Sequence, residues 1–151
     1  MPGFYSHDER FPVFQPQPMA IYLVFTERVI VCESVDQYYR LRIAVVDEIN
    51  PDVTVDEDDE VGLASVFELF LGDAYDSVRC THFRYFTDGD GDFANGVVKC
   101  AELCFEGNKT LFLDPTHTFG IQIGNSAQLD RWLEDYFNTS DEYTEHWWRR
   151  D

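Results

Sequence analysis

The chain has 151 residues and a formal net charge of −18 at pH 7, because 29 acidic residues face only 11 lysines and arginines. This length fits one domain, and 13 Phe, 8 Tyr and 3 Trp can fill a core, which excludes a disordered acidic tail. The charge disfavours direct nucleic-acid binding, which needs a basic patch. No hydrophobic run spans a bilayer and no signal-peptide pattern is present, so we expect a cytoplasmic protein.

Residues 1–18 are expected to form an extended arm. Pro12, Pro16 and Pro18 disfavour a helix and favour polyproline or turn geometry. The interleaved aromatic residues predict that the arm packs onto the body or onto a partner. We expect residues 19–151 to form a single domain.

The next segment mixes strand and helix signals. Alternating apolar residues predict one bent strand or a hairpin over residues 19–32. Ser34 begins a capping-box pattern, and the apolar spacing after it predicts a helix over residues 34–49, although Leu41, Ile43 and Val45 also alternate as in a strand.

Between Arg42 and Arg79 the chain carries eleven carboxylates and no lysine or arginine. Residues 52–60 are expected to form an acidic loop or short strand. The apolar spacing of residues 63–71 then predicts an amphipathic helix of about ten residues, capped by Gly72. Part of the acidic run would lie at the N-terminus of that helix and stabilise its dipole.

The second half of the chain contains the clearest strand signals. Residues 78–86 and 97–106 predict strands, although the latter also fit helical spacing. Gly107 and Asn108 fit a two-residue hairpin turn, a turn is expected at Asp114 and Pro115, and residues 119–123 predict another strand.

Ser126 is expected to cap a helix with one apolar stripe, and a capping box at residues 139–142 predicts a short terminal helix that carries Trp147 and Trp148. The predicted fold is α+β: an antiparallel sheet of four to six strands with two to four helices packed on one face.

Two clusters suggest metal sites. Residues 88–92, Asp-Gly-Asp-Gly-Asp, resemble the opening of an EF-hand calcium loop, but Phe93 and Lys99 replace its required Gly and Glu. A tetrahedral zinc site is an alternative, although its ligand spacings are uncommon ones. Its ligands would be Cys80, His82, Cys100 and Cys104. Buried reduced thiols are the simpler interpretation of the cysteines, and we expect no cofactor.

We find no nucleophile elbow, paired catalytic His or phosphate-binding loop, so we expect no enzymatic activity. The charge of −18 equals that of about 30 Å of duplex DNA. In size, charge and aromatic content the chain resembles DNA-mimic inhibitors and acidic immunity proteins as a functional class. The hypothesis is an acidic protein, encoded by a phage, plasmid or virus, that occludes the basic cleft of a nucleic-acid-binding partner such as a defence or DNA-repair enzyme.

The candidate partner-binding residues are the acidic clusters and the tryptophan pair. They are Asp47, Glu48, Asp52, Asp56, Glu57, Asp58, Asp59, Glu60, Asp88, Asp90, Asp92, Trp147 and Trp148. Two other functions stay open: a metal enzyme or small-ligand protein whose acidity reflects its environment, as in halophilic adaptation, and a viral structural or assembly protein. A homodimer formed through an exposed tryptophan also stays open.

Overall fold

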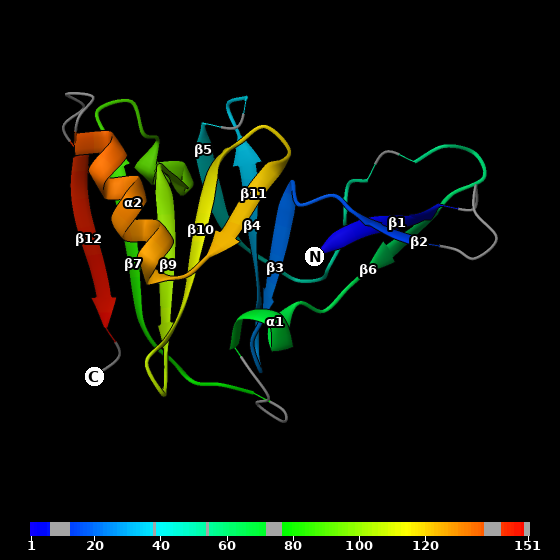
Figure 1. Ribbon diagram of the computed structural model, residues 1–151, viewed down its shortest axis with the longest axis horizontal. Helices are drawn as coiled ribbons and strands as arrows, with labels where there is room; N and C mark the ends of the chain where they lie inside the picture. The colour runs from blue at the N-terminus through cyan, green and yellow to red at the C-terminus, as the bar shows by residue number, and fades with distance from the viewer. Residues whose placement is uncertain (7–12, 38, 54, 72–76, 138–142, 150–151) are drawn as a thin grey trace.

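The computed structural model describes residues 1–6, 13–37, 39–53, 55–71, 77–137 and 143–149. Within them are twelve strands, two α-helices and one 3₁₀ helix, arranged in three antiparallel sheets. The protein is therefore mostly β, and the α+β prediction of one sheet with two to four helices on one face is wrong. Two sheets form a sandwich, and the third is an arm that extends from it (Figure 1).

The four-stranded sheet of the sandwich has the order β3-β4-β5-β8. It comprises β3 (Ala20–Val24), β4 (Val29–Val35), β5 (Arg40–Val46) and β8 (Val97–Val98). The β3–β4 hairpin predicted in residues 19–32 is confirmed.

The predicted helix over residues 34–49 is wrong, because β4 and β5 pair there instead. Asp36 and Gln37 both take positive φ angles, 54° and 58°, in the tight turn that joins these strands. The alternation of Leu41 and Ile43, which places both in the core, outweighs the helical spacing.

The five-stranded sheet has the order β11-β10-β9-β7-β12. It comprises β7 (Cys80–Asp88), β9 (Cys100–Phe105), β10 (Lys109–His117), β11 (Gly120–Gly124) and β12 (Tyr143–Arg149). The strand predicted over residues 97–106 is confirmed for β9, whereas Val97 and Val98 form β8 in the other sheet. Gly107 and Asn108 lie in the predicted turn with positive φ, but the loop has three residues and not two, because Phe105 pairs with Lys109. The turn expected at Asp114 and Pro115 is wrong, because β10 continues through a register irregularity to His117.

Each face of the five-stranded sheet has its own core. Ala101, Leu103 and Leu113 pack between the two sheets with Ile21 and Leu41 of the smaller one. On the other face α2 (Ser126–Phe137) covers the sheet, and its residues Leu129 and Trp132 pack on Phe86, Cys100 and Phe112. The helix begins as predicted, but its cap is Asn125 and not Ser126. Asn125 Oδ1 accepts a hydrogen bond from the Ala127 amide at 2.9 Å, and the Asn125 main-chain amide donates to Gln128 Oε1 at 3.0 Å.

The predicted terminal helix is wrong, because residues Tyr143–Arg149 form β12, which pairs along its whole length with β7. The proposed capping box at 139–142 lies outside the described residues. The predicted ten-residue helix is much shorter: α1 covers only Phe67–Leu71, and Leu63 ends strand β6. The acidic run therefore precedes a strand and does not cap α1, and Gly72 lies outside the described residues.

The arm is a three-stranded antiparallel sheet of order β2-β1-β6. It comprises β1 (Pro2–Ser6), β2 (Val13–Pro16) and β6 (Glu60–Leu63), so the segment predicted to be extended pairs with itself and with the end of the acidic run. The remaining regular element is the 3₁₀ helix η1 (Phe93–Asn95), which joins β7 to β8.

Candidate functional site

The arm is held in shape by main-chain bonds and by close ring packing at its centre. The Met1 ammonium donates to the Ala64 carbonyl at 2.9 Å, and the Ala64 amide donates to the Met1 carbonyl at 2.9 Å. Gly3 lies so close to the Phe14 ring that an added Cβ would stand 2.5 Å from it. The rings of Tyr5 and Phe14 meet edge to face at 5.3 Å. Glu60, the last residue of the acidic run, begins β6 and pairs with Tyr5 of β1, which attaches the run to this sheet.

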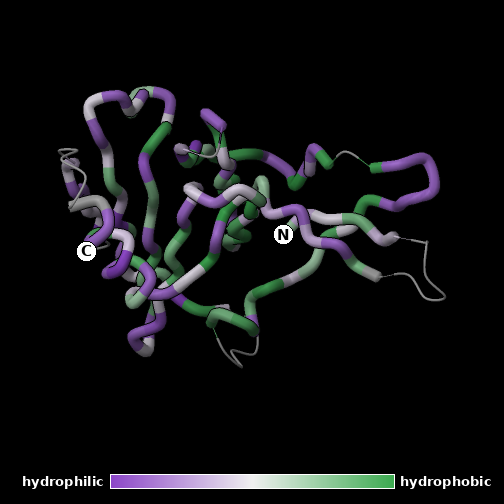
Figure 2. Tube along the Cα trace, turned by 45° about the horizontal axis from the view of Figure 1, so that its top comes forward, coloured by the Kyte–Doolittle hydropathy of each residue, from purple (hydrophilic) through white to green (hydrophobic). Residues whose placement is uncertain are grey.

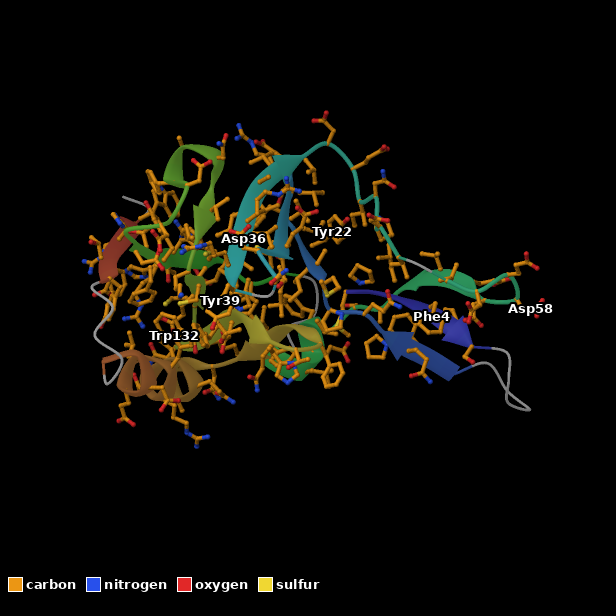
Figure 3. The ribbon with its side chains drawn as sticks, turned by 90° about the horizontal axis from the view of Figure 1, so that it is seen from above. Phe4, Tyr22, Asp36, Tyr39, Asp58 and Trp132 are labelled. Carbon is orange, nitrogen blue, oxygen red and sulfur yellow. The ribbon has the colours of Figure 1, made fainter. Side chains whose placement is uncertain are left out.

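The acidic turn, residues 56–60, lies at the end of the arm that is farthest from the sandwich; Figure 3 labels Asp58 there, and Figure 2 shows a hydrophilic stretch at this end. The Asp59 amide donates to the Asp56 carbonyl at 3.1 Å, which closes the turn. Asp56, Glu57, Asp58 and Glu60 are exposed. Among the described residues no ion pair joins any of the five carboxylates to a cation. Four carboxylates thus face solvent and that of Asp59 is half-buried, and none of the five has a neutralising partner in the described part of the chain.

Asp47, Glu48 and Asp52 lie between the end of β5 and the acidic turn, and all three are exposed. The Tyr22 hydroxyl attaches this connection to the sandwich by donating to the Asn50 carbonyl at 2.8 Å. Burial, together with the negative charges of Glu33 and Asp52, raises the pKa of Tyr22. The acidic surface therefore continues from the sandwich along the connection to the arm.

Asp88, Asp90 and Asp92 behave differently from one another. Asp88 lies at the end of β7 with 13% of its side chain exposed, and it pairs with Arg40 at 2.6 Å and with Lys99 at 3.5 Å. Its charge is neutralised inside the fold, so it does not contribute to the acidic surface. Asp90 and Asp92 are exposed, and Asp92 accepts a bond from the Asn95 side chain at 2.6 Å.

Trp147 and Trp148 project to opposite faces of β12, as neighbours on a strand must. The ring of Trp147 lies between two guanidinium groups, 4.8 Å from Arg84 and 5.3 Å from Arg149. Trp148 faces the space between the two sheets, beside Phe83 and Leu103. Both tryptophans are about half exposed, and they lie on the sandwich and not on the arm.

The four candidate zinc ligands do not converge. A register irregularity in β7 turns Cys80 toward the core between the sheets, whereas His82 contacts Trp147 on the other face. Burial raises the pKa of the Cys80 thiol and raises that of Cys100 strongly. Within the part of the chain that the structure describes, no three His, Cys, Asp or Glu residues are grouped to hold a metal ion.

Sequence reasoning did not find a cavity of about 790 Å³ at one end of the sandwich. Its lining comes from the β3–β4 hairpin, from β5, from β7 and β9, and from Trp148 of β12. No local pattern signals such a site, because its walls are apolar strand residues that are distant in sequence.

Comparisons with protein-family models, curated proteins and solved structures found no match. Among the described residues, neither α-helix has the length and apolar composition required to cross a membrane. The function is therefore inferred from the geometry of this chain alone.

Proposed function

We propose that this chain is a non-enzymatic binding protein whose acidic turn enters the basic cleft of a nucleic-acid-binding partner. The observation that supports this most directly is the position of residues 56–60: five consecutive carboxylates at the end of a projecting sheet, without an ion-pair partner among the described residues. A solubilising charge needs no such projection, whereas insertion into a cleft does.

The electrostatics favour a cationic cleft as the target. Exposed unpaired carboxylates keep their full hydration until a partner removes it, so they act first over a distance and speed encounter with a basic surface. The turn gathers Asp56, Glu57, Asp58 and Asp59 beside Glu60 at the start of β6, so negative charge is concentrated at one end of the arm, as it is along a phosphate backbone. The partner would then be blocked by competition with its own nucleic acid.

The arm also offers contact area beside the charge. Tyr5, Val61 and Leu63 are exposed at 39%, 48% and 49% on strands β1 and β6. Apolar contacts of this kind supply lasting affinity after electrostatic encounter, since charge pairs at the rim of an interface mainly change the association rate. Tyr5 lies on one face of this sheet, and Val61 and Leu63 lie on the other. The arm therefore combines steering at its tip with exposed apolar side chains on both of its faces.

The proposal is tested by capture and competitive elution. The purified chain, immobilised at low salt, should retain one or a few nucleic-acid-binding proteins from an extract of its own source, and added duplex DNA or RNA should release them at constant ionic strength. Retention that nucleic acid does not reverse would refute competition for a cleft. Retention of acidic or neutral proteins would refute the electrostatic basis.

A further inference from the structure

The cavity of about 790 Å³ lies at the end of the sandwich where the β3–β4 hairpin turn faces the start of β7. Its volume falls in the range of small-molecule pockets, roughly 300–1,000 Å³. It is separate from the acidic turn, because no residue of the arm lines it.

The interior of this cavity is apolar. Its walls are formed by Leu23 and Ile30 of the hairpin, Ile43 of β5, Phe83 of β7 and Leu103 of β9. Trp148 contributes a large ring that remains 52% exposed. Water gains few hydrogen bonds in such surroundings, so the site favours an apolar chain or ring.

Cations outnumber anions in the lining of this cavity, whereas anions outnumber cations in the protein as a whole. They are Arg28, Arg79 and Glu27, two cations and one anion in a chain with 29 acidic and 11 basic residues. Arg28 is exposed and forms no ion pair among the described residues. Arg79 is held only loosely, 3.8 Å from Glu106, with both side chains more than half exposed. Both guanidinium groups can therefore turn to a ligand.

We propose that this cavity binds an amphipathic small molecule with one anionic head group, a medium-chain carboxylate or a compound of the same chemistry. The apolar part lies against Leu23, Ile30 and Phe83, and the carboxylate is bound by Arg28 and Arg79. An arginine fork matches a carboxylate in geometry as well as charge. The net charge of −18 opposes any anion, so a preference for an anionic ligand would have to come from this local pair of arginines.

Three twelve-carbon probes test the head-group preference: dodecanoate, dodecanol and dodecyltrimethylammonium, each titrated below its micelle concentration and followed by calorimetry. We expect one dodecanoate per chain and at least tenfold weaker binding of the cationic probe. The Arg28→Ala/Arg79→Ala variant should lose this preference, whereas Arg131→Ala on α2 should keep it. Equal or tighter binding of the cationic probe, or no binding of dodecanoate, would overturn the proposal.

The location is tested by a pair of matched filling variants. Ile30→Phe narrows this cavity, whereas Ile123→Phe narrows a neighbouring cavity of about 590 Å³ that Ile30 does not line. We expect only Ile30→Phe to weaken dodecanoate binding, by at least tenfold, with both variants folded by circular dichroism. Equal losses in the two variants would place the ligand elsewhere.

Cysteine alkylation gives a readout on the unaltered protein. Cys80 lines the cavity, and Cys104 lies on the other face of the sheet beside Glu102. Saturating dodecanoate should slow iodoacetamide modification of Cys80 at least fivefold and leave Cys104 unchanged, as resolved by peptide mass spectrometry. Unchanged Cys80 reactivity would contradict the assigned site even if dodecanoate binds.

Discussion

Arg40 donates two hydrogen bonds to the Asp88 carboxylate, from Nη1 to Oδ1 at 2.6 Å and from Nη2 to Oδ2 at 3.1 Å. The pair joins β5 of one sheet to the end of β7 in the other. Both side chains are largely buried, 11% and 13% exposed. The acidic residues are therefore of two kinds. Asp88 stabilises the fold through this ion pair, whereas the carboxylates of the acidic turn form no ion pair among the described residues.

Removal of the Asp88 carboxylate should destabilise the protein. Asp88→Ala leaves Arg40 largely buried, with the exposed Asp36 at 3.7 Å as its remaining ion pair among the described residues. Breaking a buried pair on one side costs about 3 kcal/mol. Urea unfolding at pH 7 measures the loss. Asp90→Ala, at an exposed neighbour, is the control and should change the free energy of unfolding by no more than about 0.5 kcal/mol.

The same pair should make stability depend on pH in a defined window. Burial acts to raise the pKa of Asp88, but the hydrogen bonds and charge of Arg40, with the charge of Lys99, outweigh it and hold the pKa below its ordinary value. Because the pKa is lower in the folded state, the ionised Asp88 stabilises the protein fully at pH values above the unfolded-state pKa of about 3.9. This stabilisation is lost as the pH falls through the folded-state pKa. The stability gap between wild type and Asp88→Ala should stay constant above about pH 5 and narrow below about pH 4. A gap that narrows near neutrality would contradict this origin.

A second ion pair tests whether burial of the two side chains determines how much an ion pair contributes to stability. Arg84 and Glu102 face each other across β7 and β9, and Arg84 donates to Glu102 Oε2 from Nε at 3.0 Å and from Nη2 at 2.5 Å. Glu102 is 2% exposed, and its Oε1 has no hydrogen-bond partner among the described residues. Arg84→Met should therefore cost about 3–5 kcal/mol, while Arg84→Met/Glu102→Leu should recover much of that loss.

The control for this double-mutant cycle is the pair of Arg42 and Glu33. These residues also face each other across neighbouring strands, but their side chains are 51% and 30% exposed. Its coupling energy should be about 0–1 kcal/mol. Coupling energies of equal size in the two cycles, measured by urea unfolding, would show that burial does not govern the Arg84 pair.

Two glycines with nearly the same positive φ should respond differently to alanine. Gly96 has a φ of 73°, and an added Cβ would stand 2.4 Å from the Ile43 carbonyl oxygen, where β5 approaches the start of β8. Gly107 has a φ of 76° and open space around the same position. Gly107→Ala should cost about 1–2 kcal/mol from backbone strain alone. Gly96→Ala should cost clearly more because the backbone must also move, and equal losses in thermal unfolding would contradict this.

The sequence predicted the elements whose signals are local. The Gly107 and Asn108 turn, strand β11 and helix α2 were all expected, because turn geometry and apolar spacing within one segment determine them. The failures were at Leu41 to Val45, where helical and strand spacings both fit, and at Trp147 to Trp148, where a capping box predicted a helix. Strand pairing decided both outcomes: β5 pairs with β4 across a tight turn, and β12 pairs with β7, which is distant in the chain.

The candidate sites could likewise be predicted only where their residues are close together in the sequence. The sequence places five carboxylates together at residues 56–60, but their position at the tip of an arm depends on the pairing of β6 with β1, which brings residues 2–5 against residues 60–63. Likewise Asp88 belongs to the Asp-Gly repeat in sequence and to a buried ion pair in the structure. The cavity was not found, because Ile30, Phe83 and Trp148 meet only in the folded protein.

The central claim is that the acidic turn, and not the overall charge, binds the partner. Two variants separate these: Asp56→Asn/Glu57→Gln/Asp58→Asn in the turn, and Asp130→Asn/Glu134→Gln/Asp135→Asn on the exposed face of α2, each of which removes three negative charges. The decisive measurement is the association rate constant of each with the captured partner at low salt. We predict a fall of about tenfold or more for the turn variant and less than about twofold for the helix variant, with a weaker salt dependence in the turn variant. Equal falls in both variants, or an unchanged rate in the turn variant, would contradict the proposed function.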